Sequence, residues 1–124
     1  MAEHNELGQK GEELAKGFLQ SHGLRILETN YRYGKDEVDI IAEEDDFLVI
    51  VEVKTRSSAY HGEPEVFVDK KKQYFLIRAA NKYINWKNID KETRFDIVSV
   101  LITPNGHRVK HIRDAFYPTL RGGW

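Results

Sequence analysis

Apolar residues recur along the chain at two spacings, which predict two helices and five strands. At helical spacing, residues 6–22 carry an apolar stripe that ends at Gly23. Residues 69–86 carry a second stripe, with Asp69 as a candidate N-cap, and a loop is expected over 56–67. Alternating or wholly apolar runs predict strands at 24–33, 37–43, 47–55, 94–103 and near 107–112. This order predicts an α/β sandwich built around a mixed sheet.

The strand at 47–55 is expected to lie in the middle of the sheet. Residues 47–51 are apolar at every position, which is typical of a strand covered on both faces. The short acidic turn at 44–46 makes the strand at 37–43 its antiparallel neighbour. Asn105 and Gly106 form a strong hairpin signal between the last two strands.

The composition suits a single cytoplasmic domain. The chain has 124 residues, of which 40% are hydrophobic, and we expect one domain with a flexible tail at 119–124. Cysteine is absent, so disulfides and thiolate metal sites are excluded and any metal must be held by oxygen or histidine. The polar start lacks the apolar segment of a signal peptide, and no apolar run is long enough to cross a membrane.

Charge is divided unevenly along the chain. Residues 1–69 hold 7 Lys or Arg and 16 Asp or Glu, a net charge of −9. Residues 70–124 hold 12 Lys or Arg and 4 Asp or Glu, a net charge of +8, so the whole chain carries −1. An acidic region attracts a divalent cation and a basic region attracts a phosphate backbone. Charge alone fits ordinary surface variation equally well.

Charged residues interrupt two strands that the pattern places side by side. Glu52 and Lys54 stand two apart and therefore project from one face of their strand. Burying such a pair without partners is costly, so this strand end must be open to solvent or serve a ligand. Asp39 lies in the neighbouring strand, and the turn at 44–46 brings it near the same end of the sheet.

Two converging carboxylates are hard oxygen ligands for Mg²⁺ or Mn²⁺. A lysine beside them can stabilise the charge that develops on a phosphoryl group, so Asp39, Glu52 and Lys54 together suit phosphodiester hydrolysis. The alternative is a structural ion pair of Lys54 with Glu52 or Asp39. Spacing alone favours the ion pair, because short E-x-K matches are common by chance.

A family resemblance favours the catalytic interpretation instead. Residues 37–42 (EVDIIA) and 51–56 (VEVKTR) resemble the D…E-x-K centre of the PD-(D/E)XK nuclease superfamily. The chain as a whole resembles the YraN family of uncharacterised bacterial proteins. The supporting stretches occur in order along the chain: Gly11-Glu12, Asn30-Tyr31-Arg32, 37–42, 51–56, Lys72-Gln73, 95–98 and 114–116.

The resemblance implies a restriction-endonuclease-like fold, related to archaeal Holliday-junction resolvases, in which a glutamate of the first helix joins the metal site. Glu12 matches that glutamate. On a helix it lies about 100° from the middle of the apolar stripe and can reach inward, whereas Glu13, at about 160°, faces solvent. The alternative for Glu12 is a carboxylate of the first turn that interacts with the helix dipole. Val38 replaces the proline of the superfamily motif.

Cationic residues near these strands are candidates for nucleic-acid binding. Lys70, Lys71 and Lys72 open the second helix, where the helix N-terminus favours phosphate, although they could equally form a solvated face. Lys72 and Gln73 match the family motif. Arg56 follows the charged strand and could hold a phosphate.

Three readings of function follow. The first is a Mg²⁺- or Mn²⁺-dependent endonuclease acting on DNA rather than RNA, including branched DNA, with Glu12, Asp39, Glu52 and Lys54 as its catalytic residues. The second is a nucleic-acid-binding module of the same fold with little turnover, and the third is a domain whose charged strand ends are purely structural. The presence of all four residues favours the first. So short a chain is expected to grip its substrate with a partner or as a homodimer.

Arg32 is a weaker phosphate-binding candidate, and Asp96 is expected to be structural.

Overall fold

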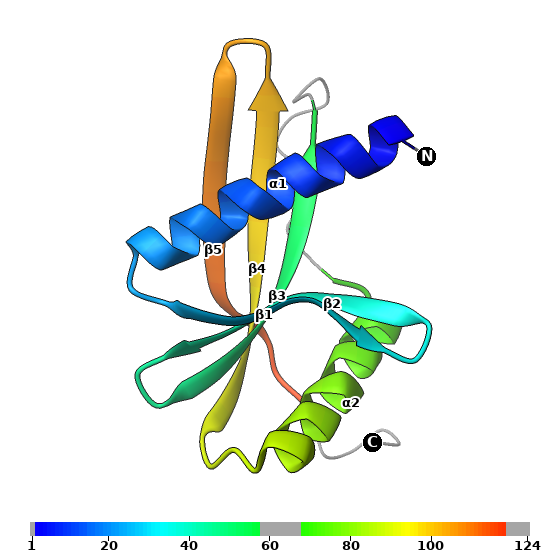
Figure 1. The fold of residues 1–124 in the computed structure, drawn as a ribbon, viewed down its shortest axis with the longest axis vertical. Coiled ribbons are helices and arrows are strands. Elements are labelled where there is room, and N and C mark those ends of the chain that lie inside the picture. Colours follow the sequence, from blue (N-terminus) through cyan, green and yellow to red (C-terminus); the bar gives the residue numbers. More distant parts are fainter. Residues whose placement is uncertain (1, 58–67, 119–124) are drawn as a thin grey trace.

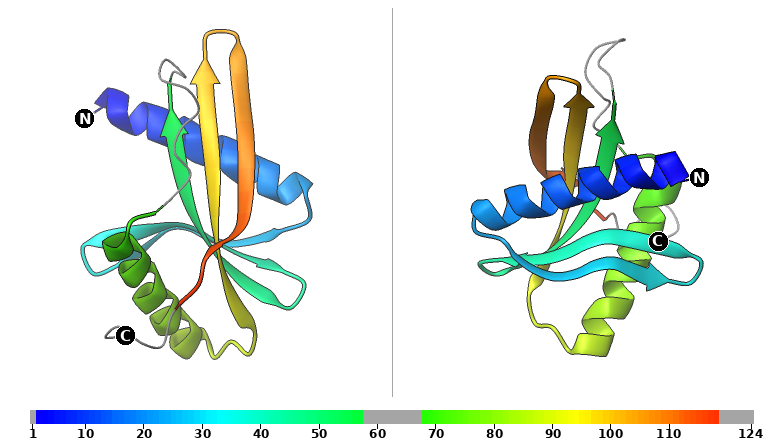
Figure 2. Two further views of the ribbon diagram at one scale, coloured as in Figure 1. Left: turned by 180° about the vertical axis from the view of Figure 1, so that it is seen from behind. Right: turned by 45° about the horizontal axis from the view of Figure 1, so that its top comes forward.

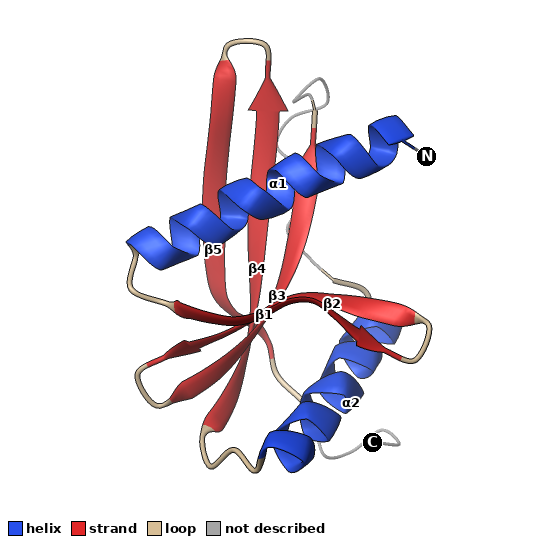
Figure 3. Cartoon of the chain, in the orientation of Figure 1, coloured by secondary structure: helices blue, strands red, loops and turns tan. Residues whose placement is uncertain are grey.

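Two helices cover opposite faces of one five-stranded sheet (Figure 1). The computed structural model describes residues 2–57 and 68–118, and the side chains among them from residue 6 onward. The elements in chain order are α1 Ala2–Ser21, β1 Arg25–Tyr33, β2 Asp36–Glu44, β3 Phe47–Arg56, α2 Lys70–Lys87, β4 Glu92–Thr103 and β5 Gly106–Phe116. The predicted order of elements is therefore confirmed (Figure 3). The expected tail at 119–124 and most of the expected loop at 56–67 lie outside the described residues.

The largest differences from the prediction are at two element ends. α1 begins at Ala2 rather than at residue 6, and β5 runs to Phe116 rather than ending near 112. The strand pattern of β5 is interrupted by a register shift opposite residues Phe95 and Ile97, where Asp114 has a positive φ of 53°. The extra residue of such a bulge breaks the two-residue alternation of side chains, so the sequence pattern does not indicate the second half of the strand.

The strands are ordered β1-β2-β3-β4-β5, so β3 is central as predicted. β3 and β4 run parallel and are joined through α2, whereas the other neighbouring pairs are antiparallel. A parallel pair needs such a crossover, which explains the mixed sheet. The β2–β3 turn is tight, because Glu44 pairs with Phe47 and Asp45 takes a left-handed φ of 54°.

Each face of the sheet has its own apolar core, and Figure 2 shows the two helices on opposite sides. The core under α2 is built chiefly from Ile41, Leu48, Ile50, Leu76, Ala80, Tyr83, Phe95 and Ile97. The core under α1 is built from Ala15, Leu19, Leu24, Ile40, Ala42, Val49, Val51, Val98 and Val100. Alternate residues of β3 thus enter alternate cores, as a strand covered on both faces requires.

β2 and β3 separate before either strand ends. Their residue pairing stops at Ile40 and Val51. Beyond that point β2 curves away with β1, while β3 continues from Glu52 to Arg56 beside β4 alone (Figure 1). We call this point the fork. Asp39 and Glu52 are therefore the first residues beyond the paired part of β2 and β3, where the two strands begin to separate.

A buried polar cluster ties the opposite end of β2 to β4 and β5. Asp96 is 1% exposed and accepts hydrogen bonds from Arg94, His111 and the backbone N–H of Asp114, at 2.7–3.0 Å. Arg94 also pairs with Glu44 at 2.6 Å. Burial alone would raise the pKa of Asp96, but the hydrogen bonds from His111 and Arg94 outweigh it and lower that pKa. Asp96 thus has the structural surroundings that were expected of it.

α1 approaches β3 closely at one glycine. Gly11 is buried, and a methyl group placed on it would overlap the side chain of Thr55. The absence of a side chain therefore lets the helix backbone lie directly on the strand. Glu12, the next residue, is carried by this contact to the fork.

Replacing Gly11 by alanine should destabilise the protein. Alanine is favoured over glycine within a helix by about 1 kcal/mol, but the clash with the β-branched Thr55 opposes that gain and costs about 1–3 kcal/mol. Gly17→Ala is the matched control, since nothing lies within 4 Å of its added methyl group and α1 should become more stable. Denaturant unfolding of both variants checks the prediction. Equal stabilisation by the two substitutions would contradict the close packing of α1 on β3.

Candidate active site

Asp39 occupies the fork and is held there by the backbone of β3. The N–H of Val53 donates a hydrogen bond of 2.8 Å to Asp39 Oδ2. This N–H lies beyond the last residue pair of β2 and β3, so a side chain bonds it where the ladder has ended. The bond fixes one carboxylate oxygen of Asp39 against β3 and holds the carboxyl group next to Glu52.

Glu52 lies on the α2 side of β3 and carries an unsatisfied oxygen. Its Oε1 atom is buried and accepts no hydrogen bond within the described part of the chain. The ammonium of Lys72 on α2 lies 3.8 Å from Oε1, a separation that makes an ion pair but is too long for a hydrogen bond. A buried carboxylate oxygen in this state is costly, and a bound cation would relieve that cost.

The two carboxyl groups perturb each other. Burial and the charge of Glu52 raise the pKa of Asp39 to about 8, against the opposing hydrogen bond from Val53. Burial also raises the pKa of Glu52, although Lys72, Lys54 and hydrogen bonding with Asp39 act in the other direction. In the absence of a metal, the pair therefore retains a proton near neutral pH, since two close carboxylates in a partly dry site cannot both ionise.

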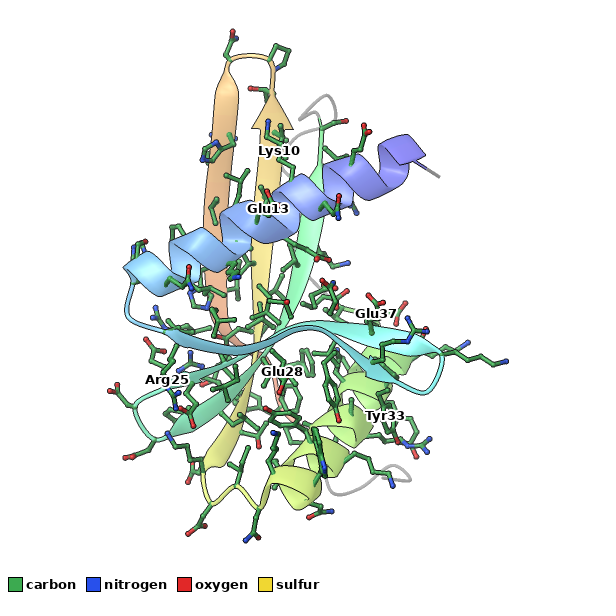
Figure 4. All side chains as sticks on the ribbon, in the orientation of Figure 1. Lys10, Glu13, Arg25, Glu28, Tyr33 and Glu37 are labelled. Atoms are coloured by element: carbon green, nitrogen blue, oxygen red, sulfur yellow. The ribbon has the colours of Figure 1, made fainter. Side chains whose placement is uncertain are left out.

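Glu12 reaches the same site from α1. Its Oε1 accepts a hydrogen bond of 2.8 Å from Asn30 Nδ2 on β1, and its charge raises the pKa of both Asp39 and Glu52. Glu13 is exposed and lies on the outward side of α1, as predicted (Figure 4). The alternative of a first-turn carboxylate for Glu12 is wrong, because α1 begins ten residues earlier at Ala2.

Two open clefts meet at Glu12. The first, of about 200 Å³, is lined by Asp39, Asn30 and the α1 residues Gln9 and Lys16. The second, of about 450 Å³, is lined by Glu52, Lys54, Arg56 and the start of α1. The three carboxylates expected as metal ligands thus share one region. Among residues 6–57 and 68–118, however, no three His, Asp or Glu side chains already stand in a metal-ligating arrangement.

The predicted cationic residues fall into different places. Lys54 and Arg56 line the larger cleft, and Arg56 Nη1 donates to the carbonyl of Thr55. Lys70 and Lys71 are exposed at the start of α2, after the N-cap Asp69, whose Oδ1 accepts from the N–H of Lys72. Arg32 lies outside both clefts and pairs with Glu37 at 3.0 Å.

Three placements were not foreseen from the sequence. Lys72, expected only as a nucleic-acid-binding residue, forms an ion pair with Glu52. Gln73 braces the start of α2, because its Nε2 donates to the carbonyl of Val68 at 2.7 Å. Asn30 donates a hydrogen bond to Glu12, and its own backbone is left-handed, with φ at 51°. The only signal for Asn30 was its place in one of the stretches that carry the family resemblance.

The order of elements and the acidic residues at the fork define a restriction-endonuclease-like core. The chain belongs to the UPF0102 (YraN) family: the model described as "Uncharacterised protein family UPF0102" matches residues 11–100, which include the fork and Lys72. It is similar to a UPF0102 protein of Christiangramia forsetii, with 49% identity over 117 residues, covering 94% of this chain and 98% of that protein. A UPF0102 protein of Bacteroides thetaiotaomicron is 47% identical over 120 residues, covering 97% and 99%. The resemblance to the YraN family is confirmed.

The elevated pKa of Asp39 predicts how stability depends on pH. A group whose pKa rises from 3.8 to about 8 on folding binds its proton more tightly in the native state. Stability should therefore fall as pH rises from about 5 to 8, by at most about 1.4 kcal/mol per pH unit for one proton. Glu52 shifts in the same direction. The lowered pKa of Asp96 acts only under more acidic conditions, where that stabilisation is lost.

Asp39→Asn tests this prediction, because the amide oxygen can still accept from Val53 but cannot ionise. The melting temperature of the wild type in EDTA should drop between pH 5 and 8 more steeply than that of the variant. Parallel curves for the two proteins would show that Asp39 is not the titrating group.

Proposed function

We propose that the protein is a Mg²⁺- or Mn²⁺-dependent endonuclease that hydrolyses phosphodiester bonds of DNA, branched DNA included. The observation that carries the proposal is the buried, unbonded Oε1 of Glu52 beside a proton-retaining Asp39, at the wall of an open cleft. A structural ion pair would satisfy its carboxylate oxygens. This pair instead leaves one oxygen without a hydrogen-bond donor.

The donor set suits a hard divalent cation. Asp39 and Glu52 would hold the ion, and Glu12 would add a third carboxylate from α1. Within the described chain there is no cysteine or histidine among the residues lining the two clefts, so oxygen ligands dominate. When bound, the ion would polarise the phosphoryl group and acidify the attacking water.

The remaining residues act on the substrate and on the site itself. Lys54 would stabilise charge on the phosphoryl group in the transition state, because it lines the cleft next to Glu52. Arg56, at the same wall, would hold a phosphate of the backbone. Val53 N–H keeps Asp39 oriented, and Asn30 keeps Glu12 from turning into solvent. We place the reaction in the cytoplasm, with a second copy of the chain enlarging the grip on DNA.

One observation favours the second candidate, a nucleic-acid-binding module with little turnover. Lys72 already compensates part of the charge on Glu52 without any metal. A lysine that permanently replaced the ion would keep the fold and the cationic surface while abolishing hydrolysis. The two candidates differ in their response to metal.

Divalent metal should stabilise the wild type at pH 8. Mn²⁺ must displace the proton held by the carboxyl pair, so the increase in melting temperature should grow from pH 6 to pH 8. Asp39→Asn should lose most of that increase, because one ligand charge is gone. Glu37→Gln is a suitable control, since Glu37 is partly exposed and paired with Arg32 outside the clefts. A melting temperature that does not change on addition of Mn²⁺ would favour the binding module.

Lys54→Ala should separate turnover from metal binding. Its stabilisation by Mn²⁺ should persist, while the cleavage rate should fall on the order of 10²-fold, since the ammonium acts in the transition state. Lys35→Ala, which removes an exposed lysine from the β1–β2 turn, should cleave like the wild type. The measurement is single-turnover cleavage of junction, flap, duplex and single-stranded DNA with Mg²⁺ or Mn²⁺. If no substrate is cut by the wild type, the endonuclease proposal fails.

A further inference from the structure

The helix α2 is unusually basic for a helix that packs on a sheet. Its 18 residues include six Lys or Arg and no Asp or Glu. The carboxylates of Asp69 and Asp90 lie just outside its ends. The net charge of the helix is therefore +6, which is complementary to a polyanion rather than to an average protein surface.

Its outward face carries two cationic side chains between two aromatic ones. Tyr74, Arg78, Lys82 and Trp86 follow each other at four-residue intervals and are all exposed. Successive members are rotated by about 40°, so the four form one slanted row covering about 120° of the helix. The buried residues Leu76, Ala79, Ala80 and Tyr83 lie on the other side, against the sheet. We call this row the α2 strip.

The two rings at the ends of the α2 strip are exposed but anchored. Trp86 is 65% exposed, although it lies against Tyr31 and Tyr83 at centroid distances of 6.4 and 6.1 Å. Tyr74 is 39% exposed and lies beneath the guanidinium of Arg78. Exposed aromatic area costs free energy in water, and a ring held in place loses little entropy on stacking.

The α2 strip starts at the end of α2 that reaches the candidate active site. Tyr74 is two residues after Lys72, whose ammonium pairs with Glu52, and lies about 200° around the helix from it, on the outer side of α2. Trp86 is twelve residues further on, about 18 Å along the helix. The strip therefore leads away from the fork along one straight element. Figure 2 shows α2 on the face of the sheet opposite α1, so the outer surface of α2 is not covered by α1.

We propose that the α2 strip binds the single-stranded part of a nucleic acid whose phosphodiester enters the active site. Tyr74 and Trp86 would stack on bases, and Arg78 and Lys82 would contact the backbone between them. Duplex DNA offers phosphates but no free base faces, so the aromatic rings would have no partner on it. The inference rests on the proposed function for the class of ligand, although binding itself needs no metal.

Binding is measured by fluorescence anisotropy of the Asp39→Asn protein in EDTA, which prevents cleavage. The probes are a labelled oligothymidylate of about 20 nucleotides, longer than typical single-strand sites, and a duplex of the same length. Trp86→Ala should weaken binding to the single strand about 5-fold or more, and Trp86→Phe should restore most of it. Binding to the duplex should change little, because no base can reach the ring.

The cationic members are tested through salt dependence. Arg78→Gln with Lys82→Gln should lower the slope of log affinity against log salt by about 1.4, since each single-strand phosphate contact contributes about 0.7. Lys10→Gln with Lys110→Gln is the matched control, because it removes two exposed cations from α1 and β5 with the same change in net charge. That control should leave the slope nearly unchanged.

The outcomes separate this inference from the proposed function. The proposal for the α2 strip would be wrong if the two double variants lowered the salt slope equally. It would also be wrong if Trp86→Ala left the affinity for the single strand unchanged, even if the wild type cleaves DNA with Mn²⁺. Binding that depends on Trp86, without cleavage by the wild type, would support the strip and reject the endonuclease. Preference for duplex over oligothymidylate would also overturn it. Melting curves of each variant check that folding is intact.

Discussion

The hydrogen bond from the Val53 N–H to Asp39 Oδ2 stands where the ladder between β2 and β3 stops, and the site is organised around it. A continuous ladder would satisfy this region with backbone groups alone and would leave no opening in the sheet. Because the strands part, a side chain bonds the freed N–H, and its second oxygen faces Glu52 and the clefts. The separation of the two strands thus fixes the orientation of the Asp39 carboxylate.

The position of α1 decides whether the third carboxylate can take part. Gly11 allows the helix to lie on Thr55 of β3, and Asn30 of β1 then holds Glu12 by a side-chain hydrogen bond. Three elements distant in sequence therefore meet at one glutamate. Glu12 also lines both clefts, so it belongs both to the part of the site around Asp39 and to the part around Glu52.

The sequence predicts the elements well because their causes are local. The strand-forming residues of β1, the apolar run in β3 and the capping by Asp69 each act within a few residues, and the structure contains both strands and the cap. The pairing across the short acidic turn also brings Asp39 and Glu52 together. Contacts between distant elements are a different matter. Nothing local indicates that Lys72 of α2 reaches Glu52, or that Asn30 of β1 faces Glu12, since both depend on how the helices cross the sheet.

The uneven charge of the sequence acquires a spatial meaning in the fold. The acidic part of the chain supplies Glu12, Asp39 and Glu52, while the basic part begins with α2, whose first turn meets them through Lys72. A phosphate would be repelled by three carboxylates at the fork and attracted by α2. Lys54 and Lys72 offset part of that repulsion, and a divalent cation would offset the rest. Under the proposed function, the metal and α2 therefore have complementary tasks: the helix gathers the polyanion, and the ion makes the acidic fork accessible to one of its phosphates.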